Sequence, residues 1–215
     1  MIIVSGGIKG GSGKTTIATN LAIIRANDGK DVLLVDGDNQ ETATDFTNIR
    51  QQKRGEAGYT GVKLTGSALR EQTKKLRTKY DDIIIDAGGR DTAGQRAALT
   101  VADVLLVPFV PRSFDVWTIE QVSDLVAEVR EINPQLKAYT FINCGDPRGQ
   151  DNEDAAAALK KSEHLTFIDT KLVERKAFGN AAGGGISVVE WKPEDPKAID
   201  EIMSLYHFVF ASNTQ

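Results

Sequence analysis

A lysine and two threonines follow a glycine-rich turn close to the start of the sequence. Residues 7–16 read Gly-Ile-Lys-Gly-Gly-Ser-Gly-Lys-Thr-Thr and come soon after the apolar residues 2–4. Glycines let backbone N–H groups close around phosphate oxygens, and a helix that begins at the turn adds positive partial charge there. In such a P-loop, Lys14 would reach the β- and γ-phosphates of a nucleotide and the Thr15 hydroxyl would bind Mg²⁺. The residues predicted to hold the phosphates are Gly10, Gly11, Ser12, Gly13, Lys14, Thr15 and Thr16.

Two apolar runs further along the chain each end in an aspartate. Residues 32–35 lead to Asp36, and residues 83–85 lead to Asp86. Continuous apolar runs of this length are typical of parallel strands covered on both faces, and ligands gather at the carboxyl ends of such strands. Asp86 has the position of a Walker B aspartate, which holds Mg²⁺ directly or through water.

The elements that must position these residues alternate between strand-like and helical patterns. Strands are expected at residues 2–4, 32–35, 62–64, 83–86, 104–108, 139–144 and 165–168. Helices are expected after the P-loop and at residues 41–54, 67–79, 92–100, 113–131, 151–161 and around 199–210. This alternation predicts an α/β fold of the P-loop NTPase type, a doubly wound, mostly parallel sheet with helices on both faces. At 215 residues, a single domain spanning 1–215 is expected.

The amino-acid composition limits the classes of protein to which this chain can belong. The chain is 40% hydrophobic and 26% charged with a net charge of −4, as in ordinary soluble globular proteins. Its one cysteine, Cys144, excludes a disulfide framework and a multi-cysteine metal site, and is expected to be a small buried apolar residue. No apolar run approaches the ~18 residues of a membrane helix, and no signal peptide precedes the P-loop, so a cytoplasmic protein without a membrane partner is expected.

Positive charge is concentrated between residues 50 and 79. Nine Lys and Arg residues stand there against two Glu, a local balance of +7. Such a face suits nucleic acid, but solvated helix faces explain the charge equally well, and both interpretations stay open. Trp117, in the predicted helix at 113–131, is expected to anchor helix to sheet rather than to stack on bases.

The P-loop departs from the general pattern in a specific way. The pattern asks for glycine at position 8, where this chain has Ile8, and a second lysine, Lys9, follows. This resembles the deviant Walker A motif of the ParA/MinD family of ATPases. Residues 36–40 are similar to that family's D-x-D-P-Q element, with Asn39 in place of proline. Residues 111–117 and 175–190 resemble two further segments of small plasmid-type ParA partition proteins that lack a helix-turn-helix domain.

The resemblance implies an ATPase that forms a homodimer on binding ATP and Mg²⁺. In the family, the extra lysine crosses to the partner's nucleotide, so Lys9 would act there beside Lys14 in catalysis. Asp38 would orient or polarise the attacking water, and Asp36 would lie in the outer shell of the metal ion, with Thr15 and Asp86 closest to it. Asn143 would bind the adenine edge, although capping of a turn is an equally open role. Hydrolysis would be slow alone and stimulated by a ParB-like adaptor.

The ATP-bound dimer would bind DNA without sequence preference. Lys171, Arg175 and Lys176 match a region that the family uses, and residues 50–79 are a second possibility. Hydrolysis would release the DNA, so the cycle would partition a plasmid or chromosome in the cytoplasm, at the nucleoid. Positioning of a protein assembly would use the same residues and is the main alternative. A MinD-type membrane-cycling regulator and an amidoligase-type enzyme are further ones.

One departure concerns the second aspartate. The family commonly has D-x-P-P there, whereas this chain has Asp86-Ala87-Gly88-Gly89. We name residues 86–89 the switch loop, and expect its glycines to loosen it without abolishing Mg²⁺ binding.

Overall fold

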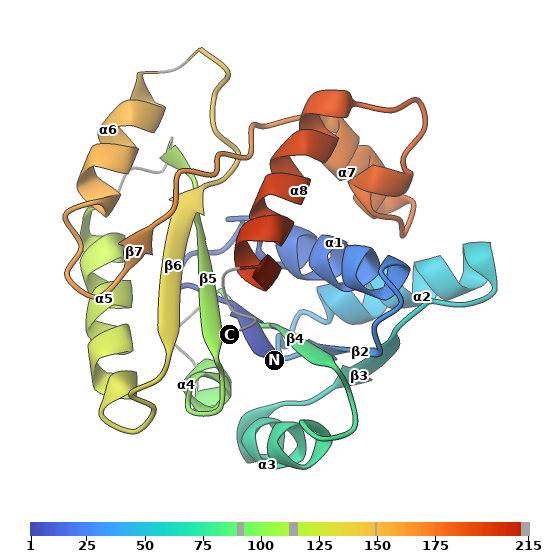
Figure 1. Ribbon diagram of the computed structural model, residues 1–215, viewed down its shortest axis with the longest axis horizontal. Helices are drawn as coiled ribbons and strands as arrows, with labels where there is room; N and C mark the ends of the chain where they lie inside the picture. The colour runs from blue at the N-terminus through green and yellow to red at the C-terminus, as the bar shows by residue number, and fades with distance from the viewer. Residues whose placement is uncertain (90–92, 112–115, 149, 212–215) are drawn as a thin grey trace.

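In the part of the chain that the structure describes, seven parallel strands form one sheet with helices on both faces (Figure 1). The computed structural model describes residues 1–89, 93–111, 116–148 and 150–211. The strands are β1 Ile2–Ser5, β2 Val32–Asp36, β3 Thr60–Lys63, β4 Asp82–Asp86, β5 Val104–Phe109, β6 Lys137–Ile142 and β7 Thr166–Phe167. The predicted doubly wound α/β architecture of the P-loop NTPase type is confirmed.

The strand order is β3-β2-β4-β1-β5-β6-β7, which places β1 in the middle of the sheet. Ile3 pairs with Ile84 of β4 on one side and with Val104 of β5 on the other. The backbone N–H of Ile2 also donates to the Asp103 carboxylate just before β5, at 2.7 Å. Because the connections diverge on either side of β1, a crevice opens outside its carboxyl end, where the P-loop begins.

Alternate strand residues supply two separate apolar cores, as the period of a strand requires. Ile2 and Val4 face a core covered by α3, α4, α5 and α6, whereas Ile3 faces one covered by α1, α7 and α8. The helices are α1 Lys14–Asn27, α2 Thr42–Arg54, α3 Gly66–Leu76, α4 Ala93–Leu99, α5 Val116–Arg130, α6 Asp151–Leu159, α7 Lys176–Gly183 and α8 Pro196–Ala211.

The C-terminal helix packs on the sheet as predicted. Ile202, Leu205 and Val209 of α8 are fully buried in the same core as α1. In the described residues, none of the helices has both the length and the apolar character that a bilayer crossing requires.

Two sequence predictions about single side chains are wrong. Trp117 is 75% exposed, because it lies two residues before the buried Ile119 and a helix turns by about 200° over that interval. Cys144 is only half-buried and has a φ of +50°, since it follows β6 at a sharp turn into the loop.

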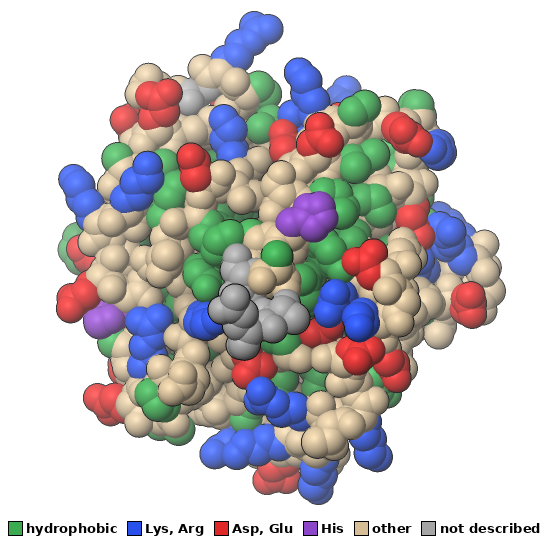
Figure 2. All heavy atoms as spheres, viewed as in Figure 1, with side chains coloured by type: hydrophobic (Ala, Val, Ile, Leu, Met, Phe, Trp, Pro, Cys, Tyr) green, Lys and Arg blue, Asp and Glu red, His purple; other side chains and the backbone are tan. Residues whose placement is uncertain are grey.

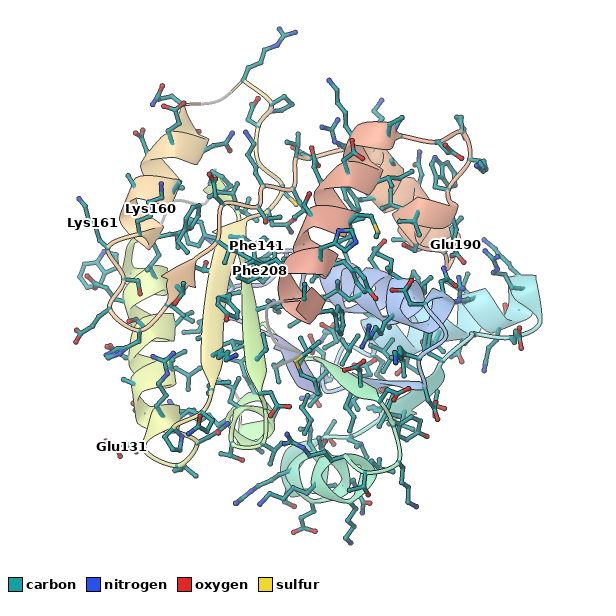
Figure 3. The ribbon with its side chains drawn as sticks, in the orientation of Figure 1. Glu131, Phe141, Lys160, Lys161, Glu190 and Phe208 are labelled. Carbon is teal, nitrogen blue, oxygen red and sulfur yellow. The ribbon has the colours of Figure 1, made fainter. Side chains whose placement is uncertain are left out.

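A buried polar network ties the segment before α8 to the first two helices. Its members are Asn20, Arg50, Ser187 and Glu190. Asn20 accepts hydrogen bonds from the Ser187 hydroxyl at 2.7 Å and from the Val188 N–H at 2.9 Å. Glu190, at the end of the short 3₁₀ helix η2 (Val188–Glu190), accepts two from Arg50 at 2.8 and 3.0 Å. Figure 3 shows Glu190 beside α2.

This network removes one cation from the predicted basic segment. Arg50 is only 5% exposed, and its Nε donates to the Ala57 carbonyl at 2.6 Å. A Cβ on Gly185, at φ +67°, would lie 2.6 Å from the Arg50 nitrogen, so the backbones touch closely. Of the exposed lysines and arginines that remain, those of α3 lie at the lower edge of Figure 2, whereas Lys53 and Arg54 lie on α2.

Candidate functional site

An open cleft of about 990 Å³ lies at the carboxyl edge of the sheet. Among the described residues, four segments meet there: the P-loop after β1, the loop after β2, the switch loop after β4 and Cys144 after β6. Its lining includes the predicted residues Gly10, Gly11, Gly13, Lys14, Thr15, Thr16 and Asp38, together with Gly88 and Gly89. Its size is at the upper end of the range for small-molecule sites.

The P-loop is held in shape by a side chain from β6's end. Asn143 is buried, and its amide donates to the Ser12 carbonyl at 2.7 Å. A Cβ on Gly13, which has φ +88°, would lie 2.2 Å from that amide nitrogen, so only glycine fits. Of the two roles considered for Asn143, the structure shows the turn-holding contact, and the adenine contact stays a prediction.

Lys14 stands at the start of α1 with little access to water. Its side chain is 6% exposed, and its Nζ donates to the Lys9 carbonyl at 2.7 Å. Burial lowers the pKa of Lys14, against the opposing influence of the Asp86 and Asp38 charges. A desolvated cation at a helix N-terminus is suited to receive a phosphate.

Asp86 is buried beneath the cleft, where it contacts Thr15 of the cleft lining. The Thr15 hydroxyl donates to Asp86 Oδ2 at 2.6 Å, and Asp86 Oδ1 is buried without a hydrogen-bond partner among the described residues. Burial raises the pKa of Asp86 to about 7; the Thr15 hydrogen bond opposes this and the Asp36 charge adds to it. A buried carboxylate short of partners fits a divalent cation.

The fit is to Mg²⁺ in particular. The described residues contain no cluster of three or more His, Cys, Asp and Glu that could hold a metal. Mg²⁺ does not need one, because it is commonly bound by one or two carboxylates with phosphates and water completing its shell. Thr15 and Asp86 would hold it here.

Asp36 is buried beside this pair but does not line the cleft. Its Oδ2 accepts from the Thr44 N–H at 2.8 Å and from the Thr44 hydroxyl at 2.7 Å. Its Oδ1 accepts from the Asp38 N–H at 3.1 Å. Asp36 therefore anchors the start of α2 and the backbone of Asp38, and its outer-shell role toward the metal stays a prediction.

The two glycines of the switch loop lie close to neighbouring segments. A Cβ on Gly88 would lie 3.2 Å from Asp38 Oδ1, and one on Gly89 would lie 2.9 Å from the Gly10 Cα. Glycines at these two positions thus allow the loop to touch both Asp38 and the P-loop. A larger residue would prevent this close approach, and the expected loosening of the switch loop stays a prediction.

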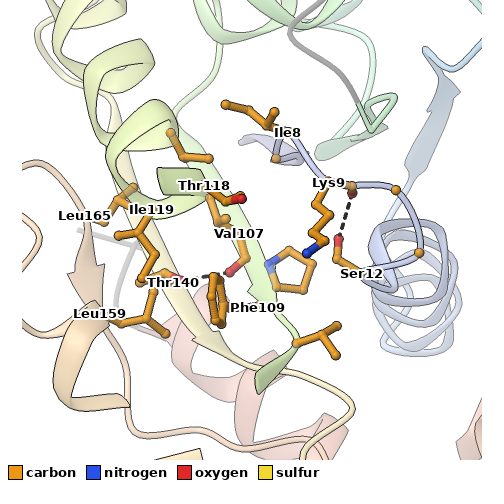
Figure 4. A pocket seen from close by; sticks show the side chains of 16 residues that line it. Ile8, Lys9, Ser12, Val107, Phe109, Thr118, Ile119, Thr140, Leu159 and Leu165 are labelled. Atoms are coloured by element: carbon orange, nitrogen blue, oxygen red, sulfur yellow. Dashed lines mark hydrogen bonds between the residues drawn. The ribbon is translucent and has the colours of Figure 1, made fainter. Parts of the chain in front are cut away.

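The structure does not bring every predicted residue into the cleft. Lys9 lines a smaller, largely apolar cavity of about 40 Å³ behind the P-loop, with Val107 and Ile119 (Figure 4). Lys171 and Lys176 are exposed beyond β7 and at the start of α7. Arg175 pairs with Glu201, Nη2 to Oε1 at 2.6 Å.

Comparison with known proteins identifies the family. Residues 2–188 match the family described as the CobQ/CobB/MinD/ParA nucleotide binding domain. The chain belongs to this family. Within it, the chain is a ParA-type ATPase, in agreement with the resemblance of its P-loop.

The relatives include a protein named for carboxysome distribution and a chromosome-partitioning ATPase. The chain is 26% identical to maintenance of carboxysome distribution protein A of Halothiobacillus neapolitanus, over 95% of this chain and 94% of that one. It is 32% identical to the chromosome-partitioning ATPase Soj of Thermus thermophilus, over 88% of each. The structure of the cell division ATPase MinD of Pyrococcus furiosus superposes with a TM-score of 0.77 at 19% identity, covering 98% of both chains, which shows the shared fold.

Three residues that position this ParA-type site were not found from the sequence. Thr44 holds Asp36, Asn20 links the P-loop helix to the polar network, and Gln95 lies between the P-loop and the switch loop. Asn20 could have been found from the sequence, because it is a polar residue next to Leu21 on the apolar face of the helix that follows the P-loop. Thr44 and Gln95 stand in weakly patterned segments and could not have been found in this way.

Proposed function

We propose that this ParA-type ATPase hydrolyses ATP with Mg²⁺ and partitions DNA. The observation that carries the proposal is the meeting of Lys14, Asp38 and the Thr15–Asp86 pair around one cleft. Lys14 and the P-loop N–H groups bind the phosphates. Asp38, held by Asp36 and Gly88, orients the attacking water, and bound Mg²⁺ supplies charge neutralisation at the phosphates.

The position of Lys9 supports a dimeric active form. Its carbonyl accepts from Lys14, while its side chain is exposed and lines the cavity behind the P-loop instead of its own cleft. Lys9 therefore acts in trans, on the nucleotide of a second copy bound face to face through ATP. There it neutralises charge that develops on the phosphates.

Exposed lysines of the ATP-bound dimer bind DNA through its phosphates. Lys171 and Lys176 carry this contact better than Arg175, whose guanidinium is occupied by Glu201. Because such contacts release counterions, binding is independent of sequence and weakens with salt. The protein acts in the cytoplasm, at the nucleoid, and a ParB-like adaptor stimulates hydrolysis and so releases the DNA.

A second cargo class has a specific observation in its favour. The relative from Halothiobacillus neapolitanus, whose name concerns carboxysome distribution, aligns over nearly the whole chain. The same cycle of DNA binding and release positions a protein assembly if the adaptor binds that assembly instead of a DNA locus.

The first test is retention of the purified protein on random-sequence DNA with ATP and Mg²⁺ or with ADP, across a salt series. Lys9→Ala and Lys14→Ala are compared with wild type. Retention that needs ATP, falls with salt and is lost in both variants supports the proposal. Retention independent of nucleotide, or none in any state, contradicts DNA binding by the ATP dimer.

A further inference from the structure

Gln95 is a buried amide that bridges the two loops of the cleft. It lies on α4 and is 2% exposed. The surroundings assign the orientation of its amide, because an oxygen turned toward the Gly88 and Gly7 carbonyls would face only acceptors. With the nitrogen there, Gln95 donates to the Gly88 carbonyl at 2.9 Å and to the Gly7 carbonyl at 3.2 Å, whereas the other orientation offers a long 3.5 Å contact from the Gly7 N–H. One side chain thus holds the switch loop to the first residue of the P-loop.

The helix that carries this amide, α4, is held firmly in the core. Ala98 and Leu99 of the same short helix are fully buried in the core beneath β1 and β4. Two hydrogen bonds from one buried donor to two carbonyls fix the distance between those carbonyls. Gln95 therefore sets where Gly88 lies relative to the P-loop.

Gly88 in turn supports Asp38. A Cβ built on Gly88 would lie between 3.2 and 3.4 Å from the carboxylate atoms of Asp38, so Gly88 lies beside that carboxylate with little room for a side chain between them. Asp38 is also held by its N–H bond to Asp36 and by the Gln40 N–H, which donates to Asp38 Oδ1 at 3.1 Å. If Gly88 shifts, the Asp38 carboxylate loses one of the neighbours that keep it in place.

We propose that Gln95 is a positioning residue for hydrolysis, acting on Asp38 through Gly88. This inference rests on the proposed ATP hydrolysis. Gln95 is not among the described residues that line the cleft, and the groups that bind phosphates and Mg²⁺ belong to other residues. Its loss therefore lowers the rate of hydrolysis while leaving ATP binding nearly intact.

Gln95→Leu tests this, because leucine keeps the volume and removes both hydrogen bonds. Single-turnover hydrolysis of Mg²⁺-ATP should slow by roughly 10- to 100-fold, as expected for a misplaced catalytic group. The dissociation constant for ATP should stay within about threefold. Gly88→Ala, which pushes on Asp38 directly, should give a similar loss, and the double variant should be no slower than the worse single one.

Asn133 offers a matched control at the other end of α4, and it separates loss of the Gln95 contacts from a general loosening of that helix. Its amide also donates to two backbone carbonyls, those of Leu99 at 2.9 Å and Ala102 at 2.7 Å. Asn133→Leu breaks the same kind of contact at the opposite edge of the sheet. It should leave the hydrolysis rate unchanged even if it lowers the melting temperature.

Hydrogen exchange separates this inference from the proposed function. In the nucleotide-free protein, amides of the switch loop should exchange at least several-fold faster in Gln95→Leu than in wild type, and not faster in Asn133→Leu. Unchanged exchange overturns the inference whether or not wild type hydrolyses ATP. An unchanged hydrolysis rate, or equal losses of rate and ATP affinity, overturns it too. Absence of hydrolysis in wild type instead contradicts the proposed function, and exchange still decides whether Gln95 holds the loop.

Discussion

In the polar network between α2 and η2, Glu190 receives two hydrogen bonds from Arg50, and Asn20 accepts two from the Ser187–Val188 end. At the cleft, Asp86 keeps a buried oxygen that no described residue satisfies. Both regions bury a carboxylate. Both oxygens of Glu190 accept hydrogen bonds, whereas one oxygen of Asp86 has no partner among the described residues. The difference indicates that the network stabilises the fold, whereas the carboxylate at the cleft is suited to bind a cation that comes with a ligand.

The largest expected effect separates binding from folding at the cleft. Lys14→Ala should weaken ATP binding by roughly a thousandfold or more, because it removes the buried cation that faces the phosphates. The melting temperature of the nucleotide-free protein should not fall, since the charge that is removed was desolvated. Titration with a fluorescent ATP analogue and thermal melting measure the two. A marked loss of stability with retained binding would reverse the assignment.

The network should give the opposite pattern. Glu190→Ala leaves Arg50 buried without its carboxylate, and should lower the free energy of unfolding by about 3 to 5 kcal/mol. ATP affinity at a temperature where the variant is folded should stay within about twofold. Chemical denaturation of this variant and of the double variant Arg50→Met with Glu190→Leu checks the reason. The double variant should regain most of the stability, because no unpaired charge remains buried.

The free energy of unfolding should depend on pH because of the unsatisfied Asp86 carboxylate at the cleft. Because the pKa of Asp86 is raised from 3.8 to about 7, the folded protein keeps a proton that the unfolded chain releases between these values. This group therefore makes the nucleotide-free, Mg²⁺-free protein less stable as pH rises from about 4 to about 7, by on the order of 3 kcal/mol. Urea unfolding of wild type and Asp86→Asn at pH 5 and pH 8 measures it. The variant should lack this part of the pH dependence, and equal slopes would contradict it.

The smallest effect is expected outside both regions. Trp117 is three-quarters exposed, so Trp117→Ala should change the free energy of unfolding by less than about 0.5 kcal/mol. Ile119→Ala, two residues further along α5, is the matched buried control and should cost about 2 to 5 kcal/mol. Denaturant titration of both variants measures the change in the free energy of unfolding. Similar losses for the two variants would show that Trp117 packs in the core.

The sequence was informative where one local pattern decided the outcome. Apolar runs such as residues 83–85 predicted buried parallel strands, and the glycine-rich P-loop predicted the turn that begins α1. The structure confirms these elements, with boundaries shifted by a few residues at ends that depend on caps.

Contacts between distant segments could not be predicted in this way. The tie from Gln95 to Gly88, and the tight packing of Gly89 on Gly10, depend on how three loops meet in space. Trp117 was misplaced because an aromatic residue in an amphipathic helix is usually buried, and only the phase of α5 against the sheet reveals otherwise. Charge counting likewise included Arg50, which is engaged by Glu190 from far along the chain.

The central place of β1 also governs how the protein is made. The strand that leads into the P-loop is synthesised before both of its neighbours, because β4 and β5 follow it by some 80 and 100 residues. Contacts of such long sequence separation close slowly. A nascent chain that ends before β5 thus exposes an apolar strand with at least one open edge, a species that chaperones would have to shield from aggregation.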